Sequence, residues 1–289
     1  MKKIIALAVA SAFAVPALAA DVTVSGDVEY MYIDADAGSA FNSGDQDITV
    51  SASEEIGDGL SVAASLEVDG DSDTATAGMQ SDSSLTISGS NFSIAIGDAV
   101  GAASESFDEV SDKAEQGGTS GETLISTEHS LLLTVTPADG VTVAVSTGSV
   151  DDSVTATSYT VNSYAVQFNV MGATIAYGIA DNENNDKNIN TMSVSYSAGP
   201  VSIGYDSISN VGYVDKDDQT NVGVAYAYGN GNLFVESGEL KDDSASTSTE
   251  TTAVGASYKL GPVNLYALRN SVKTTTTDHQ TYIGVEYAF

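Results

Sequence analysis

Hydrophobic and polar residues alternate with a period of two along most of the chain. In residues 281–289, every second residue counted back from Phe289 is apolar or tolerated by lipid, and the residues between are smaller or more polar. This period predicts a strand with one apolar and one polar face. The edge strand of a soluble sandwich fits the pattern. The closing strand of a transmembrane barrel fits it equally well, because such a barrel must leave no open edge.

The first strand shows the same pattern. One face carries apolar or aromatic residues and the other carries Thr23, Ser25, Asp27 and Glu29; the first face consists of Val22, Val24, Gly26, Val28, Tyr30 and Tyr32. A strand of about ten residues crosses a bilayer when it is tilted. A loop rich in Gly, Asp and Ser is expected to follow at 34–46.

The alternation of turn signals predicts how many strands there are. Seven short turns are expected near residues 57–59, 89–91, 137–140, 171–172, 199–200, 229–232 and 261–262. Eight longer polar loops are expected near 34–46, 69–83, 98–128, 149–157, 181–190, 207–219, 239–250 and 271–279. Fifteen connections join sixteen strands, with fourteen or eighteen as neighbouring alternatives. The predicted fold is all-β: a transmembrane, antiparallel, up-and-down β-barrel with a water-filled lumen.

Aromatic residues recur just before the turns of the second half. Four precede turns, namely Phe168, Tyr196, Tyr226 and Tyr258, and Tyr287 continues the series just before the C-terminus. In a barrel these side chains would form a ring at one height, as aromatic residues do at a membrane interface.

The N-terminus predicts export. Two lysines, an apolar run and the small residues Ala17-Leu18-Ala19 are typical of a secretory signal peptide, here residues 1–19, with the barrel over 20–289. No later segment approaches the roughly 18 consecutive apolar residues of a membrane-spanning helix. The chain has no cysteine, so no disulfide is expected.

The charge is strongly negative. Nine basic residues face 40 acidic ones, a formal net charge of −31, and the chain has a single arginine, Arg269. Nucleic-acid binding requires a positive field, so no nucleic-acid partner is expected. Acidic side chains are better tolerated around water-filled space and in solvated loops than in a compact core.

Two hairpins carry a family resemblance. Residues 54–67 (EEIGDGLSVAASLE) and 85–98 (LTISGSNFSIAIGD), together with the terminal Phe289, resemble the Gram-negative general porins, especially the proteobacterial type. The resemblance implies an outer-membrane diffusion channel and a homotrimer. It also implies that Tyr287 and Phe289 form the signal read by the barrel-assembly machinery. The irregular stretch 99–128 would be the loop that folds inward and constricts the pore; a flexible surface loop is the alternative. Its acidic residues are Glu105, Asp108, Glu109, Asp112, Glu115 and Glu122.

Strand parity predicts the pore wall. The residues expected to point inward are Asp27, Glu29, Asp47, Glu67, Glu236 and Glu286, with Lys259 as the one inward base. Alignment to the resembled family adds Asp98 and puts Asp47 and Asp98 where porins carry arginines. The chain therefore departs from the family in lacking the basic half of the pore wall. Rings of carboxylates favour cations, so a cation preference is expected. Arg269 has the outward parity and is not expected in the pore.

Catalysis and cofactors receive little support. The only histidines are His129 and His279, and no Gly-x-Ser-x-Gly motif frames a serine, so we expect no enzyme and no cofactor. Asp69, Asp71 and Asp73 provide oxygen ligands in one short loop, a weak calcium signal. Divalent ions on acidic loops could also bridge to neighbouring lipopolysaccharide.

Three functions fit these observations. A general porin that passes small hydrophilic solutes and ions is favoured. A substrate-selective channel would need an aromatic track in the lumen. A closed barrel with a structural or adhesive role is the third. A soluble secreted β-protein is the alternative at the level of the fold.

Overall fold

The computed structural model describes residues 21–289 except 37, 71–79, 99–128, 153–156, 183–187, 212–216, 243–246 and 275–276. The predicted signal peptide (1–19) and the predicted constriction loop (99–128) therefore lie outside the described residues. Within the described ranges, no helix is long and apolar enough to cross a membrane.

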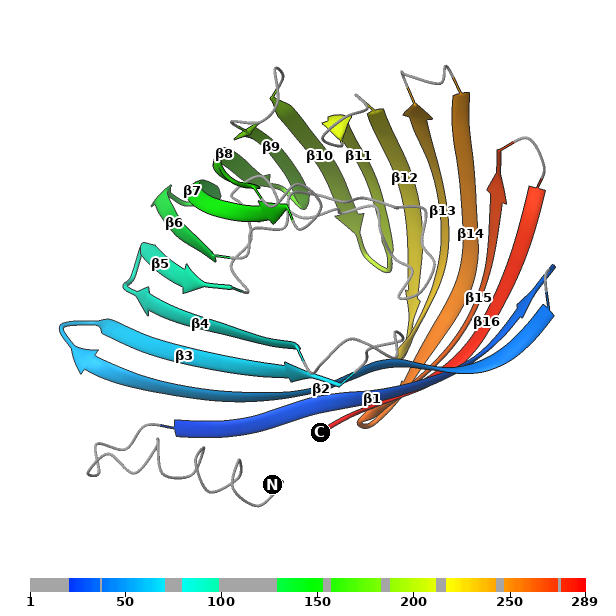
Figure 1. The fold of residues 1–289 in the computed structure, drawn as a ribbon, viewed down its shortest axis with the longest axis horizontal. Coiled ribbons are helices and arrows are strands. Elements are labelled where there is room, and N and C mark those ends of the chain that lie inside the picture. Colours follow the sequence, from blue (N-terminus) through cyan, green and yellow to red (C-terminus); the bar gives the residue numbers. More distant parts are fainter. Residues whose placement is uncertain are drawn as a thin grey trace.

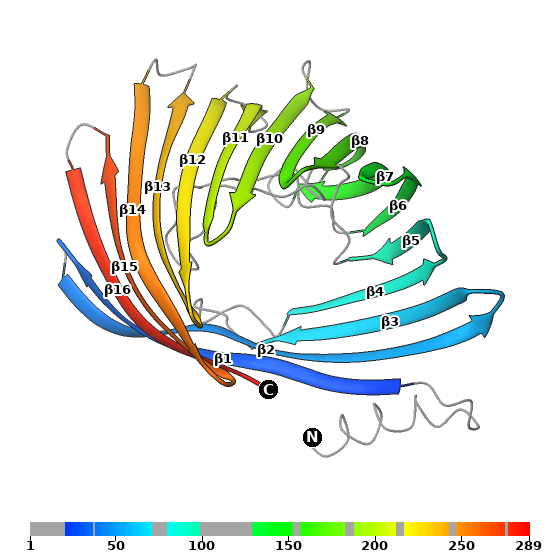
Figure 2. The same ribbon diagram turned by 180° about the vertical axis from the view of Figure 1, so that it is seen from behind.

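Sixteen antiparallel strands form one closed barrel in which each strand pairs with its sequence neighbours (Figure 1). The strands are β1 (Asp21–Ala35), β2 (Gly38–Gly57), β3 (Leu60–Asp69), β4 (Gln80–Ser88), β5 (Phe92–Gly97), β6 (His129–Ala138), β7 (Val141–Asp152), β8 (Thr157–Val170), β9 (Ala173–Asn182), β10 (Ile189–Ala198), β11 (Val201–Val211), β12 (Asp217–Tyr228), β13 (Gly231–Asp242), β14 (Thr247–Leu260), β15 (Val263–Lys273) and β16 (Thr277–Ala288). Figure 2 shows the same unbroken order from behind. The predicted class and strand number are confirmed.

The barrel closes by pairing of the first and last strands. The register runs from Asp27↔Ala288 to Ala35↔Gln280. Phe289 extends it by one residue: its N–H donates to the carbonyl of Gly26 at 2.9 Å, and its carbonyl accepts from the Gly26 N–H at 3.2 Å. Phe289 therefore lies against β1 (Figure 1), and each of the sixteen described strands pairs with two neighbours.

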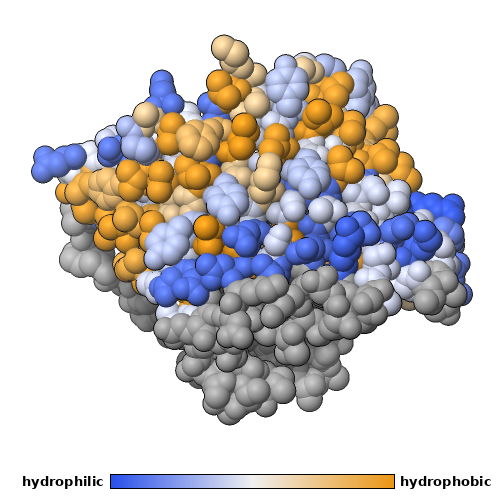
Figure 3. Space-filling view, turned by 90° about the horizontal axis from the view of Figure 1, so that it is seen from above, coloured by the Kyte–Doolittle hydropathy of each residue, from blue (hydrophilic) through white to orange (hydrophobic). Residues whose placement is uncertain are grey.

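The predicted two-residue period separates two faces. Directly paired residues point to the same face of the sheet. The registers therefore assign each paired residue to the inner or the outer face of the barrel. Large apolar residues on one parity are exposed on the outer surface, whereas the other parity is buried or polar. Figure 3 shows the outer side as an apolar band next to a hydrophilic one. Such a band is what a lipid-facing barrel wall requires.

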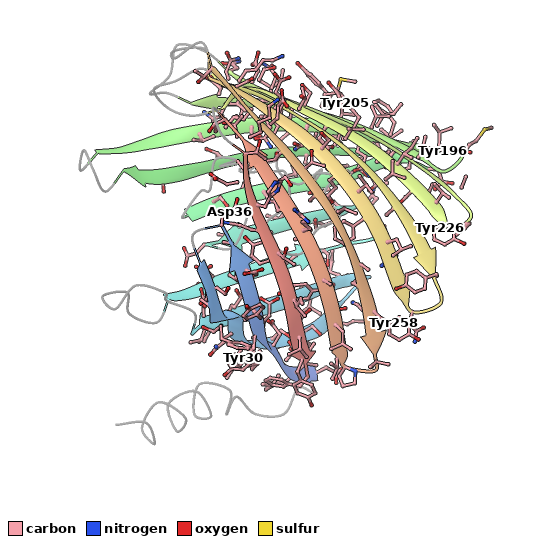
Figure 4. All side chains as sticks on the ribbon, turned by 90° about the vertical axis from the view of Figure 1, so that its right-hand side faces the viewer. Tyr30, Asp36, Tyr196, Tyr205, Tyr226 and Tyr258 are labelled. Atoms are coloured by element: carbon pink, nitrogen blue, oxygen red, sulfur yellow. The ribbon has the colours of Figure 1, made fainter. Side chains whose placement is uncertain are left out.

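The predicted aromatic row lies on this outer face. Phe168, Tyr196, Tyr226, Tyr258 and Tyr287 are all exposed and occupy equivalent positions close to the short turns. Figure 4 shows Tyr196, Tyr226 and Tyr258 following the edge where the short turns lie. The row therefore marks one boundary of the apolar band.

One predicted loop is wrong. The stretch 34–46 is mostly strand: β1 continues to Ala35 and β2 begins at Gly38. Three contacts hold the hairpin. Ser39 Oγ donates to Asp34 Oδ1 at 2.7 Å, the rings of Tyr32 and Phe41 lie 5.1 Å apart, and Asp36 exchanges hydrogen bonds with His279 of β16. Polar composition suggested a loop, but pairing with β16 continues the ladder.

Six of the other seven external connections are also shorter than predicted, whereas the connection from β5 to β6 spans 98–128, as predicted. The strands β7, β11 and β13 continue to Asp152, Val211 and Asp242, well into the expected loops. All seven short turns, in contrast, fall where they were predicted. Most of these turns contain residues with positive φ, among them Asp58 and Gly59. Few residue types adopt positive φ readily, so such turns can be predicted from the sequence.

Removing Phe289 tests the closing contact. The deletion eliminates two backbone hydrogen bonds at the β1–β16 junction and the ring that stacks 6.2 Å from Tyr287. We expect the folded yield to fall severalfold, because an unpaired strand end in lipid is costly. Heat-modifiable migration on gels after refolding into detergent measures the folded fraction. Phe289→Tyr, which keeps both hydrogen bonds and the ring, should fold like the unmodified chain. Equal yields for the deletion and for this control would contradict the role given to Phe289.

Candidate pore wall

Carboxylates lie directly opposite one another on the inner face of β16 and β1–β4. The cross-strand pairs are Glu29↔Glu286, Asp27↔Asp47, Asp47↔Asp69 and Glu67↔Asp82. Like charges directly opposite in a sheet are destabilising. Apart from Glu29, which is buried, these carboxylates lie on the inside of a barrel, where water and mobile ions can screen them. The arrangement creates a strongly negative strip on one side of the lumen.

The rest of the inner wall is close to neutral. On β5–β10 the described inward-facing side chains carry no charge and are mostly Ser, Thr, Ala and Gly. Asp206 on β11 and Glu236 on β13 add two acids, both almost fully buried. Lys259 is the only base with inward parity among the described residues, and it is exposed near a short turn. The described wall therefore has a large excess of negative charge.

Neighbouring polar groups hold several of these carboxylates. Thr49 Oγ1 donates to Glu67 Oε2 at 3.3 Å, and the Asp27 N–H donates to Asp47 Oδ1 at 3.3 Å. Asn264 Nδ2 donates to Glu286 Oε2 at 3.2 Å. These bonds fix the side chains against the wall without neutralising them.

Glu29 is held differently. Its side chain is 4% exposed, and the Tyr266 hydroxyl donates to its Oε1 at 2.5 Å. Tyr266 belongs to β15 and Glu29 to β1, so this bond spans β16. The contact ties together three strands across the closing junction. The structure places Glu29 on the inner side of β1, where it is a buried carboxylate held by Tyr266.

Two glycines make room for this contact. Tyr266 pairs with Gly284 across β15 and β16, and a Cβ at Gly284 would overlap the tyrosine ring. A Cβ at Gly44 would overlap the Glu29 carboxylate and crowd the Met31 methyl group at 2.8 Å. The ring can therefore lie flat over β16 and reach β1 only because position 284 has no side chain.

The remaining predicted residues have mixed outcomes. Asp98 follows β5, and its Oδ2 accepts from Ser83 Oγ at 3.2 Å. Ser83 alternates outward from the inward-facing Asp82 and Ser84, so Asp98 does not join the inner acidic strip. Arg269 is exposed on the outer face, as predicted. The six loop acids of 99–128 lie outside the described residues.

The calcium prediction remains a prediction. Asp69 is described and faces inward, whereas Asp71 and Asp73 lie outside the described ranges. Among the residues with assigned positions, no three potential ligands are grouped so as to hold a metal ion.

Sequence reasoning missed several wall residues. Asp82, Asp206, Asn221 and Asn264 all have inward parity, and the last three are buried. Asp206 was detectable, since it alternates with Tyr205, which is exposed on the outer face. Asp82 was hidden because it was assigned to a loop.

One serine–histidine contact lies on the outer face. Ser271 Oγ and His279 Nδ1 are 2.8 Å apart. A catalytic dyad needs a group that orients the imidazole through its other nitrogen. The described residues supply no such carboxylate, because Asp36 accepts from the His279 backbone instead. The contact is explained as a link between β15 and β16.

A closed sixteen-stranded barrel with an apolar outer band and a charged inner wall defines the class of outer-membrane channels. The family model described as Gram-negative porin matches residues 6–289, and the chain therefore belongs to that family. Its location is the outer membrane. The family resemblance and the outer-membrane location predicted from the sequence are both confirmed.

Solved structures agree on the fold. An anion-selective porin from Comamonas acidovorans superposes with a TM-score of 0.76 at 16% identity, covering 94% of this chain and 100% of that one. A loop L8 deletion mutant of OmpT, an outer membrane protein of Vibrio cholerae, superposes with a TM-score of 0.76 at 15% identity, covering 94% of this chain and 100% of that one. A triple mutant of the Rhodopseudomonas blastica porin superposes with a TM-score of 0.71 at 14% identity, covering 93% of this chain and 100% of that one. No curated protein sequence matches the chain.

Replacing Tyr266 with Phe tests the contact across the junction. The substitution removes the hydrogen bond to Glu29 and keeps the ring over Gly284. Hydrogen bonds to charged groups contribute about 1.5–3 kcal/mol, so we expect a loss of that order in the free energy of unfolding. Denaturant titration in detergent micelles measures it. Tyr258→Phe, on the outer face, is the matched control and should change little. Equal stability of the two variants would contradict the structural role of the contact.

Proposed function

We propose that this porin is a passive diffusion channel that prefers cations. The proposal rests on the directly opposed carboxylates on the inner face of β16 and β1–β4. Among the described residues, only one base, Lys259, lies on the inner face of the barrel. A negative lumen concentrates cations and repels anions. The acids predicted for the constriction loop 99–128 would strengthen the same preference.

The fold alone does not decide the sign of selectivity. The Comamonas acidovorans porin has the same fold and is described as anion-selective. Selectivity in such barrels therefore has to be argued from the charges on the inner face, and here those charges are acidic.

A substrate-selective channel receives less support. Its aromatic track would have to use inward residues such as Tyr266 and Tyr282. The Tyr266 hydroxyl donates to Glu29. The Tyr282 hydroxyl donates to Gln280, and its ring packs against the buried cluster that includes Phe234 and Leu268. Phe234 and Leu268 are buried, so they offer little surface to a passing solute.

Neutralising three half-buried carboxylates of the acidic strip tests the preference. In the triple variant Asp27→Asn, Asp47→Asn, Glu67→Gln, the ratio of K⁺ to Cl⁻ permeability should fall severalfold, because three negative charges leave the wall. Reversal potentials across planar bilayers in a KCl gradient measure the ratio. Glu54→Gln on the outer face of β2 is the control and should leave it unchanged. Anion selectivity of the unmodified protein would refute the proposal.

We also propose that the protein is a homotrimer that associates through β3–β7. On these strands the exposed large apolar residues are all aliphatic: Leu85, Ile96, Leu131, Leu133, Val143 and Val145. The outer faces of β8–β12, β14, β16 and β1, in contrast, carry exposed tyrosines. Tyrosine rings favour contact with the membrane interface, so the sector without them is suited to protein contact.

A pair of tryptophan substitutions tests the trimer. Ala64 on β3 and Ala267 on β15 are both exposed on the outer face. Ala64→Trp should convert trimers to monomers because it obstructs the proposed contact, whereas Ala267→Trp should remain trimeric. Native mass spectrometry from detergent reads the state directly. Identical states for both variants would remove β3–β7 as the contact face.

The other partners follow from membership of an outer-membrane family. We propose that Tyr287 and Phe289 act as the signal for the assembly machinery, and that lipopolysaccharide surrounds the external side. The position of Phe289 at the closing junction supports the first proposal.

A further inference from the structure

Few aromatic side chains face the lumen. Among those whose side chains the structure describes, three have inward parity: Phe234 on β13, Tyr266 on β15 and Tyr282 on β16. A ring on a strand normally stands away from the sheet, so it would be exposed to a water-filled lumen. Phe234 and Tyr266 are each only 6% exposed. Both rings instead lie along the wall, over a glycine of the next strand.

Tyr266 lies over Gly284. The two residues are directly opposite each other on β15 and β16, and a Cβ at position 284 would overlap the ring. The three atoms nearest to that Cβ all belong to the tyrosine side chain. The ring therefore occupies the space that a side chain at position 284 would fill, and its hydroxyl reaches Glu29 on β1.

Phe234 repeats the arrangement two strands away. It is directly opposite Gly255 on β14, where an added Cβ would overlap the phenyl ring and lie 2.7 Å from the Ala267 carbonyl oxygen. The ring belongs to a buried cluster on the inner wall that includes Ala253 and Leu268. Each of the two buried rings is thus accommodated by a glycine on the following strand.

A side chain at either glycine would force the ring away from the wall. Carbon atoms in contact lie about 3.5–4.0 Å apart, so a ring that overlaps an added methyl group has to move by about 1 Å or more. The Tyr266 ring has little room to slide along β16, because the next inward residues there are Tyr282 and Glu286. The sheet lies behind it, so the ring would move toward the barrel axis together with the groups that cover it.

We propose that Gly255 and Gly284 set the clear width of the channel beside β13–β16 and so help to determine the largest solute that passes. Each is a positioning residue, since it acts through the ring that lies over it. The inference rests on the proposed diffusion channel. It concerns the size of the solute, whereas the acidic strip concerns its charge.

The composition of the wall makes these two positions important. On β5–β10 the described inward side chains are mostly Ser, Thr, Ala and Gly, which take up little of the lumen. A sixteen-stranded barrel encloses an aqueous lumen, and its clear width depends on what the inner side chains occupy. Displacing a ring on β13 or β15 therefore narrows the channel more than adding a methyl group elsewhere on this wall.

A double-mutant cycle on single-channel conductance tests the proposal. The four proteins are the unmodified chain, Gly284→Ala, Tyr266→Ala and the variant with both substitutions, each inserted from detergent into planar bilayers. In about 1 M KCl the screening length is about 3 Å, so conductance reports the width of the channel more than the charge of its wall. Gly284→Ala should lower the conductance by about a quarter or more, because the displaced ring narrows the channel. With Tyr266→Ala already present, the same substitution should have no effect, because its Cβ then meets no ring.

Solute size provides a second measurement. In proteoliposome swelling with uncharged sugars, Gly284→Ala should slow a tetrasaccharide more than a monosaccharide, since a narrower channel hinders the larger solute more. Unchanged conductance in Gly284→Ala, or an equal fall in both backgrounds, would overturn the proposal. A lower folded yield with unchanged conductance per channel would make the glycine purely structural and would overturn it as well.

Gly255 and Phe234 allow the cycle to be repeated if the tyrosine variants do not fold. The expected result is again a fall in conductance with Gly255→Ala that disappears when Phe234→Ala is present. The contact with the Ala267 carbonyl oxygen exists in both backgrounds and cancels from the cycle. The absence of conductance in the unmodified protein would refute the proposed channel and this inference with it, whereas anion selectivity would refute only the cation preference.

Discussion

A strand in hydrocarbon has no water with which to satisfy its backbone, and the rest of this structure follows from that constraint. The sheet must close, so the first and last strands have to meet in a defined register, and the C-terminal carbonyl and N–H of Phe289 both pair with Gly26. The same constraint explains why polar residues such as Asp34 and Ser39 remain in a strand. Asp34 pairs with Thr281 of β16 and with Ser39 of β2, and the ladder continues wherever a partner exists.

Closure separates the chain into two environments, and charge is distributed between them unequally. Carboxylates collect on the inner face of β16 and β1–β4, whereas three of the four described bases lie on the outer face of β13 and β15. The separation keeps the bases from neutralising the lumen.

The sequence was sufficient for the architecture because a period of two and turn chemistry are local properties. Asp58 and Gly59 specify a tight turn by their own backbone preferences, and Tyr196 or Tyr258 shows its face by parity alone. The external hairpin at 34–46 was not predictable, because its order depends on His279, which is far away in sequence. The same limitation applies to the site. Parity assigned Glu29 to the inside, but its burial depends on Tyr266 and on two glycines that no local pattern connects.

The crossing of Tyr266 over Gly284 has a consequence for the order of events in assembly. Both residues belong to the β15–β16 hairpin, so the ring can settle over the bare glycine before the barrel is closed. Its hydroxyl then projects beyond β16 and finds Glu29 only when β1 arrives in the correct register. A register slip of one residue would turn Glu29 to the lipid side. The hydrogen bond between Tyr266 and Glu29 can therefore form only in a barrel that has closed in the correct register.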